Sequence, residues 1–327
     1  MILIIGNFGG KGNRTNGQIG RTQNIYKCIK LNTDEKIHIV DTSYGIQALL
    51  RNMALLLKAR IVVVLPAQKA LKPILKLMHI TRKIDQTIYV AIGGWITAFV
   101  REDEGLKKLC SRCKKVFVQL DSMTVELQNL GLKNAATLPN FRIYDNQYCV
   151  AERNHHIPWK LLFYARVDES KGIELLMDSL KDLSYEFELD IYGPVAEGYK
   201  TKLTEMTKDK RIKYKGVLSE KHLETIGNYD ILCFPTHYDG EGFPGTILEA
   251  IYAGVPIIAS DWKYNREIIE RYNVGTLFDT FSANSLRTTL ENMMRDNEMW
   301  RACRNHCVDA AKELSAVRIG ERLLNEL

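Results

Sequence analysis

Short, continuous runs of apolar and often β-branched residues, separated by helical patterns or loops, limit the folds open to this chain more than any other feature. In the first half of the sequence the runs cover residues 2–5, 37–40, 61–65, 88–92 and 116–120. A run that is apolar at every position indicates a strand buried on both faces, which is typical of parallel sheets covered by helices. The pattern therefore predicts a doubly wound α/β domain.

The same alternation restarts in the second half, with runs at residues 161–165, 187–192, 231–234, 256–260 and 275–278. Residues 140–160 between the two series are polar, contain Pro158 and have no clear period, so they are interpreted as a linker. Residues 285–327 have the apolar spacing of helices. We therefore expect one domain over residues 1–150 and a second over 151–327, with the last helix crossing back to the first.

Charge divides the chain at the same place. Residues 1–150 hold 22 Lys and Arg against 10 Asp and Glu, a net +12, and the remainder has a net charge of −6. A basic half suits an anionic partner such as a phosphorylated substrate, a membrane surface or a nucleic acid, although solvated faces alone could produce it. Nucleic acid is disfavoured because the sequence has no motif that interleaves aromatic and basic residues.

Two basic stretches could rest on anionic lipid, or could instead be ordinary outer helices of the sheet. They cover residues 68–83, which include Leu71, Leu75 and Met78, and residues 105–115. The chain has seven cysteines and an apolar start without a basic leader, which predicts reduced thiols and a cytoplasmic protein. If the basic stretches rest on lipid, the protein is expected at the inner face of the cell membrane. No run approaches the roughly 18 apolar residues that a transmembrane helix needs.

The strongest local signal is a glycine-rich segment that follows the apolar run at residues 231–234. Gly240, Glu241, Gly242 and Phe243 precede an expected helix that begins near residues 244–246 and ends at Gly254. Free N–H groups at a helix start suit a phosphate, and carboxylates such as Glu241 can accept hydrogen bonds from sugar hydroxyls. A purely structural turn remains the alternative.

Several motifs in order give this chain a family resemblance. Glu241 and Glu249 form a Glu-x7-Glu pattern, and Arg166 and Lys171 lie ahead of it at the expected interval. The sequence resembles the retaining nucleotide-sugar glycosyltransferases of family four, and residues 261–267 look most like enzymes of bacterial capsule, O-antigen or exopolysaccharide synthesis. The resemblance implies the GT-B fold, in which two doubly wound, Rossmann-like domains face each other across a cleft.

The resemblance also assigns roles. Arg166 and Lys171 are expected to contact the donor diphosphate, Glu249 the ribose, and Glu241 the donor sugar. Fixed cations would lower the barrier by stabilising the charge that grows on the leaving diphosphate. The predicted catalytic set is Arg166, Lys171 and Glu241, and further donor contacts are expected from Gly242, Phe243, Gly245 and Thr246.

Loops of the first half complete the expected site. Gly9 and Gly10, after the first strand, are assigned to the donor side by resemblance. The acceptor side is expected to comprise Asn16, Gln18 and Arg21 together with Gly93, Gly94 and Trp95. Residues 91–95 lack the histidine that many family members carry there, so no histidine role is assigned. Trp95 could stack on a sugar or pack in the core.

The sequence therefore predicts a retaining hexosyltransferase that uses a nucleotide-sugar, UDP-linked by expectation, as co-substrate and has no cofactor. No metal site is predicted, because the sequence contains no Asp-x-Asp and the Cys110–Cys113 pair has no second pair of thiols. The expected acceptor is a glycan or a lipid-linked glycan. The alternatives are a GT-B nucleotide-sugar epimerase and a non-catalytic protein that binds sugar nucleotides or anionic lipid.

Overall fold

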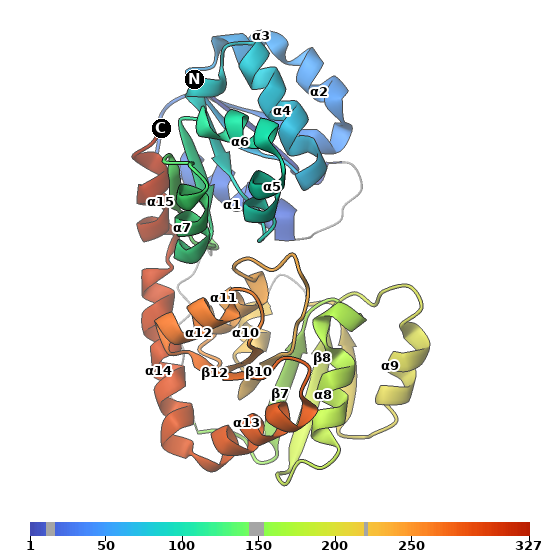
Figure 1. Cartoon of the computed structure of the whole chain (residues 1–327). Helices are drawn as coiled ribbons and strands as arrows, with labels where there is room; N and C mark the ends of the chain where they lie inside the picture. The colour runs from blue at the N-terminus through green and yellow to red at the C-terminus, as the bar shows by residue number, and fades with distance from the viewer. Residues whose placement is uncertain (11–16, 144–153, 219–221) are drawn as a thin grey trace. The chain divides into compact units, whose positions relative to one another are not determined.

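The computed structural model describes residues 1–10, 17–143, 154–218 and 222–327 and divides into two compact units (Figure 1). Unit 1 comprises Met1–Tyr144, Gly240–Phe243 and Leu314–Leu327, and unit 2 comprises Asp145–Asp239 and Pro244–Glu313. Residues 314–327 thus group with the first unit, and so does a four-residue piece of the glycine-rich segment. Among the described helices, none is long and apolar enough to cross a bilayer.

Unit 1 is built on a six-stranded parallel sheet in the order β2-β1-β3-β4-β5-β6. The strands are β1 (Ile2–Gly6), β2 (Ile37–Asp41), β3 (Ile61–Leu65), β4 (Thr87–Val90), β5 (Lys115–Val118) and β6 (Ala135–Thr137). The helices are α1 (Gly17–Leu31), α2 (Ile46–Arg51), α3 (Met53–Lys58), α4 (Gln68–Ile80), α5 (Ile96–Glu102), α6 (Glu104–Ser111), α7 (Asp121–Asn129) and α15 (Ala316–Leu324), with the 3-10 turns η1 (Thr42–Tyr44) and η2 (Ile84–Gln86). The five predicted strands are present, and β6 was missed.

The amphipathic helix α4 shows why the basic stretch at residues 68–83 was ambiguous. Leu71, Ile74, Leu75 and Met78 recur at helical spacing, and all four are buried. The interpretation in which Leu71, Leu75 and Met78 face a membrane is therefore wrong, because burying them inside unit 1 removes their apolar surface from water. The exposed side chains of α4 include cations and, at the end of the helix, Ile80.

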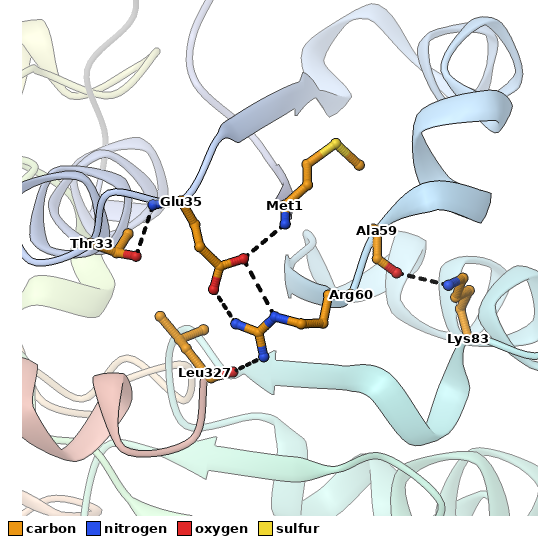
Figure 2. Close-up of polar contacts among 7 residues, drawn as sticks. All are labelled: Met1, Thr33, Glu35, Ala59, Arg60, Lys83 and Leu327. Atoms are coloured by element: carbon orange, nitrogen blue, oxygen red, sulfur yellow. Dashed lines mark hydrogen bonds and ion pairs between the residues drawn. The ribbon is translucent and has the colours of Figure 1, made fainter.

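A charged cluster lies at the amino ends of β1, β2 and β3 in unit 1 (Figure 2). The Glu35 carboxylate accepts hydrogen bonds from the Met1 nitrogen and the Arg60 guanidinium, and Arg60 also donates to the carbonyl of Leu327. The bonds from Arg60 and from Met1 lower the pKa of Glu35 to about 2. These contacts join both ends of the described chain, and Ile319 of α15 lies in the same apolar core as β1 and β3.

Unit 2 repeats the architecture with the order β12-β11-β10-β7-β8-β9, again with every pairing parallel. Its strands are β7 (Trp159–Tyr164), β8 (Phe187–Tyr192), β9 (Ile212–Gly216), β10 (Ile231–Phe234), β11 (Ile257–Ser260) and β12 (Gly275–Phe278). Its helices are α8 (Ile173–Leu180), α9 (Lys200–Met206), α10 (His222–Ile226), α11 (Gly245–Tyr252), α12 (Asn265–Tyr272), α13 (Ala283–Arg295) and α14 (Asn297–Glu313), with the 3-10 turn η3 (Glu169–Lys171). The sequence analysis did not predict β9.

In this order β7 lies between β8 and β10, so the winding direction reverses between β7 and β10. Ligands of doubly wound sheets bind where the loops on either side of such a reversal diverge, at the carboxyl ends of the strands. Two of the loops there approach very closely. A Cβ on Gly172 would lie 2.0 Å from the carbonyl oxygen of Pro235, after β10, and Gly172 has a φ of +71° that only glycine adopts easily.

We expect Gly172→Ala to destabilise unit 2 strongly. The left-handed conformation alone costs about 1–2 kcal/mol for a residue with a Cβ, and the clash with Pro235 adds to that. The matched control is Gly198→Ala, because Gly198 has a φ of +84° and a Cβ added there would meet no atom within 4 Å. Thermal unfolding should show the larger fall in Tm for Gly172→Ala. Equal shifts in the two variants would contradict the close approach.

Candidate functional site

The loop that leaves β7 places two cations at the reversal point of the unit 2 sheet. Arg166 is half exposed and forms an ion pair with Asp168, and Lys171 ends the short turn η3 that follows. The Asp168 carboxylate also accepts hydrogen bonds from the Ser170 hydroxyl at 2.7 Å and from the Lys171 N–H at 3.2 Å. One carboxylate thus fixes the backbone of the loop and the direction of the Arg166 side chain.

Asp168 is buried, and burial by itself would raise the pKa of its carboxyl. Hydrogen bonds from Ser170 and Arg166, together with the charge of Arg166, outweigh burial and hold the pKa below the ordinary value of 3.8. Asp168 is therefore charged at neutral pH. Glu169 lies in the same loop, so the formal charges of Arg166 and Lys171 are balanced by those of Asp168 and Glu169.

Lys171 is positioned by an aromatic ring from the neighbouring loop. Its ammonium lies 4.5 Å from the ring centroid of Tyr238, a cation–π contact. The backbone of Tyr238 is held in turn, because its N–H donates to the Thr236 hydroxyl and its carbonyl accepts from the Trp262 indole at 3.1 Å. The loops after β7, β10 and β11 thus cooperate to orient one lysine.

An open depression of about 320 Å³ adjoins these residues. Its lining includes Arg166, Ser170 and His237, and the loop after β8 contributes Glu197 and Tyr199. The N–H of His237 donates to the carbonyl of Ser170 at 2.8 Å, so the loops after β7 and β10 are joined at its wall. Asp168 and Glu169 also line the depression, so its walls carry both signs of charge beside Arg166.

Helix α11 begins next to the end of β7. The Thr246 hydroxyl donates to the carbonyl of Tyr164, the last residue of β7, at 2.9 Å. Pro244 occupies the N-cap position and makes no side-chain cap, so it leaves the first N–H groups, including that of Gly245, to other acceptors. This helix start has the positive dipole end that favours an anion.

Glu249 lies in the interior of α11 and is only 7% exposed. The Nε2 atom of His222, at the start of α10, lies 3.9 Å from a Glu249 carboxylate oxygen. Glu249 thus combines burial with a nearby basic ring, which suits a carboxylate that receives polar ligand groups rather than one on a solvated helix face. Sequence reasoning did not single out His222.

The segment Gly240–Phe243 folds with unit 1, although the sequence analysis placed it wholly in the second domain. The N–H of Phe243 donates to the Gln119 side chain at 3.0 Å, and its carbonyl accepts from Asn140 at 3.1 Å. Both backbone groups of Phe243 are thus engaged within unit 1, and its predicted contact with a donor would have to share or displace these partners. Glu241 in the same segment is buried.

The segment Gly240–Phe243 packs closely against the loop after β4, and Gly242 lies next to Gly93 at that contact. A Cβ on Gly242 would lie 2.3 Å from the Gln119 side chain and 2.9 Å from the carbonyl carbon of Gly93. The N–H of Gly94 donates to the carbonyl of Gly240. The absence of side chains on these glycines therefore lets the segment pack against the loop after β4 within unit 1. Trp95, partly buried at the start of α5, stacks on Phe99 with the centroids 6.4 Å apart.

Two N–H groups of the loop after β1 are engaged by side chains of Asn7 and of Asp41 at the end of β2. The N–H of Gly9 donates to the Asn7 side chain, and the N–H of Gly10 donates to Asp41 at 2.9 Å. A ligand of these N–H groups would have to displace those partners. Burial would raise the pKa of Asp41, but hydrogen bonds from Ser43, Phe8 and Gly10 outweigh it and hold the pKa below its ordinary value.

The predicted acceptor residues near the start of α1 separate into different environments. Arg21 is 1% exposed, and its guanidinium donates to the carbonyls of Leu138 and Pro139, so the structure gives this side chain a structural role inside unit 1. Gln18 is partly buried on the first turn of α1. Asn16 lies outside the described residues. Among the described residues no group of His, Cys, Asp and Glu side chains could hold a metal ion.

Comparison of the sequence with protein families identifies the second unit. Residues 151–313 match the family model described as Glycosyl transferases group 1. Residues 151–313 are a glycosyltransferase group 1 domain. This domain contains Arg166, Lys171 and Glu249, and it is the part of the chain in which the motif spacing was strongest.

Curated relatives agree with this assignment. The amylovoran biosynthesis glycosyltransferase AmsK of Erwinia amylovora is 26% identical over 145 residues, which are 41% of this chain and 36% of that protein. The N-acetylgalactosamine-N,N'-diacetylbacillosaminyl-diphospho-undecaprenol 4-alpha-N-acetylgalactosaminyltransferase of Campylobacter jejuni is 24% identical over 172 residues, or 51% of this chain and 46% of that protein. Each match spans less than half the length of the relative.

Solved structures are similar over the whole chain. Anabaena Alr3699/HepE in complex with UDP has a TM-score of 0.76 at 14% identity, covering 99% of this chain and 98% of that one. The lipopolysaccharide outer core galactosyltransferase WaaB has a TM-score of 0.70 at 16% identity, with coverage of 99% and 98%. At such identities the likeness shows the fold, and the fold is GT-B as the sequence predicted.

We expect Asp168→Asn to weaken unit 2 at neutral pH and to lose that effect in acid. The charged carboxylate has a lowered pKa in the folded protein, so its stabilisation is present above the unfolded value near 3.8 and is lost as the pH falls through the folded value. Urea unfolding at pH 6 should show a loss of about 1–3 kcal/mol. At pH 2 the variant and the wild type should differ little.

The control for this experiment is Asp182→Asn, because Asp182 is an exposed carboxylate paired only across the surface with Arg287. Such pairs contribute about 0–1 kcal/mol. A difference between wild type and Asp168→Asn that stays constant with pH would show that the carboxylate charge does not hold the loop.

Proposed function

We propose that the protein is a retaining glycosyltransferase that moves a hexose from a UDP-linked sugar to a glycan or lipid-linked acceptor during synthesis of a bacterial surface polysaccharide. In this proposal the nucleotide-sugar is a co-substrate, and the transfer needs neither a cofactor nor a metal ion. The loop of Arg166 and Lys171 beside the start of α11 carries the proposal.

The chemistry of the leaving group matches that arrangement. Cleavage of the bond from sugar to phosphate puts charge on the departing nucleoside diphosphate, and prearranged cations and helix N–H groups stabilise that charge. Asp168 and Tyr238 hold Arg166 and Lys171 in place before a ligand arrives. Glu249, buried in α11, is our candidate for the ribose hydroxyls.

Retention follows if the acceptor hydroxyl attacks from the face that the diphosphate leaves. A phosphate oxygen of the donor then takes the hydroxyl proton while the acceptor oxygen bonds to the sugar. Arg166 and Lys171 would keep that phosphate in position, and Glu241 would lie near the sugar. These roles are part of the proposal and come from the family resemblance.

The comparisons support a uridine donor and a polysaccharide product. One solved neighbour of this fold is Anabaena Alr3699/HepE in complex with UDP-glucose. The names of the two relatives refer to amylovoran biosynthesis and to a diphospho-undecaprenol acceptor, a lipid-linked glycan. We place the reaction in the cytoplasm, a compartment compatible with the six free, buried thiols among the described residues.

We expect Arg166→Ala and Lys171→Ala each to lower turnover of the UDP-sugar about 100- to 1,000-fold, because loss of one group that stabilises developing charge costs about that much. Release of UDP from a panel of UDP- and GDP-linked sugars, with and without acceptor, is the measurement. Lys181→Ala is the matched control, because Lys181 is an exposed lysine paired with Asp178 at the end of α8.

Thermal unfolding of the same variants separates chemistry from folding. Full activity of Arg166→Ala or Lys171→Ala at an unchanged Tm would refute the diphosphate role. Conversion of a UDP-sugar to its epimer, without transfer, would instead identify an epimerase. Binding of UDP-sugars without turnover under any of these conditions would identify a non-catalytic binding protein.

We further expect activity to survive treatment with EDTA, since Arg166 and Lys171 would supply the positive charge that a divalent ion supplies elsewhere. The measurement is the initial rate of UDP release before and after the chelator. A loss of activity that added manganese or magnesium restores would show that a metal takes part.

A further inference from the structure

Three aromatic rings gather at the carboxyl edge of the unit 2 sheet, on the loops that follow β10, β11 and β12. These strands are parallel neighbours, so their loops leave the same edge of the sheet. The ring centroids of His237 and Phe281 lie 5.1 Å apart, those of Trp262 and Phe281 5.8 Å, and those of His237 and Trp262 6.5 Å. We call these three residues the β10–β12 aromatic surface.

Phe281 is the exposed member of this surface. Its side chain is 64% exposed, whereas the other two rings are partly buried. Hydrogen bonds between the loops fix their positions. The Trp262 indole donates to the carbonyl of Tyr238 at 3.1 Å, and the Thr280 hydroxyl donates to the carbonyl of Asp261 at 2.9 Å. An exposed ring is thus held on loops that are bonded to one another.

The backbone at Phe281 has a conformation that a phenylalanine adopts only at a cost. Its φ is +68°, in the left-handed region, and Lys263, next to Trp262 in the chain, has a φ of +51°. A turn by itself would favour glycine or asparagine there, as at Asn273, which ends α12 with a φ of +50°. A large exposed ring at a strained position adds little to the core, which indicates a role other than packing.

The charges around the rings disfavour an anionic ligand. From the end of each strand to the start of the next helix, the three loops hold four carboxylates and one ammonium, which belong to Asp239, Glu241, Asp261, Asp279 and Lys263. The Lys263 ammonium lies 5.6 Å from the Trp262 ring centroid and pairs with Asp239 at 3.2 Å. Asp261 pairs with Arg266 of α12. Phosphates of a nucleic acid or an anionic lipid would therefore meet more negative than positive charge here.

We propose that the β10–β12 aromatic surface binds a pyranose ring of an uncharged glycan, with the C–H face of the sugar on Phe281 and sugar hydroxyls donating to neighbouring carboxylates such as Asp239. A pyranose has C–H bonds on its faces and hydroxyls around its rim, so aromatic rings and carboxylates together match it. The inference rests on the proposed function in one respect, which is that the bound glycan would be the acceptor or the product chain. The acceptor residues predicted from the sequence all lie in the first half of the chain, so this surface adds a contact from unit 2.

The test applies the full-length protein, without nucleotide, to an oligosaccharide array. The array carries uncharged hexose and N-acetylhexosamine chains beside chains that contain uronic acid or sulfate, and a dilution series of protein gives the apparent Kd. We expect binding to uncharged chains and little to the anionic ones. Phe281→Tyr keeps the ring and should bind like the wild type. Phe281→Leu has the same backbone strain but no ring face, and should raise the apparent Kd about three- to tenfold.

Two further variants separate recognition from packing. Phe281→Asn suits the left-handed backbone, so it should keep the Tm of the wild type and lose the same binding as Phe281→Leu. Val317→Asn replaces a side chain of α15 in unit 1 that is 71% exposed, and should bind like the wild type. Glycan binding that Phe281→Leu and Phe281→Asn both retain would overturn the proposal, because the ring would then serve packing only.

Three other results would also overturn it. The wild type could bind no uncharged chain, or bind the anionic chains more tightly. Free UDP could compete with the bound glycan, which would assign the sugar contact to the donor loop of Arg166. Light scattering could show self-association that Phe281→Leu abolishes, in which case a second copy covers Phe281.

The array and the UDP assay fail independently of each other. A wild type that releases UDP from a UDP-sugar but binds no uncharged chain refutes this inference and leaves the proposed function intact. A wild type that binds uncharged chains through Phe281 but turns over no nucleotide-sugar refutes the proposed function and leaves the glycan surface in place.

Discussion

The approach of Gly172 to the carbonyl of Pro235 is the constraint on which the arrangement of unit 2 depends. No side chain fits between these backbones, so the loops after β7 and β10 meet where the sheet reverses its winding. The bond from His237 to Ser170 holds them together. Because the loops are fixed to each other, the depression beside Arg166 has a defined wall instead of two independent loop ends.

The two cations of the loop after β7 contact different kinds of partner. Asp168 orients Arg166 through charge, and the ring of Tyr238 contacts the Lys171 ammonium through its quadrupole. Both side chains are thus oriented by contacts within unit 2.

The fold class could be predicted from the sequence alone, because strands buried on both faces are apolar at every position. Two edge strands, β6 and β9, were missed. β9 alternates Ile, Lys, Tyr and Lys and is exposed over most of its length, so it carries no continuous apolar run. The same limitation explains α4, whose period predicted an amphipathic helix but could not say whether Leu71 and Met78 faced the sheet or the outside.

The family resemblance, carried by motifs at fixed intervals after strands, selected Arg166, Lys171 and Glu249 from the sequence. The partners of the functional and structural side chains were decided only by the tertiary structure. It buried Arg21 against the carbonyls of Leu138 and Pro139, engaged both backbone groups of Phe243, and brought Tyr238 under Lys171. These contacts join residues far apart in the chain or in separate loops, and local sequence patterns carry no information on such pairings.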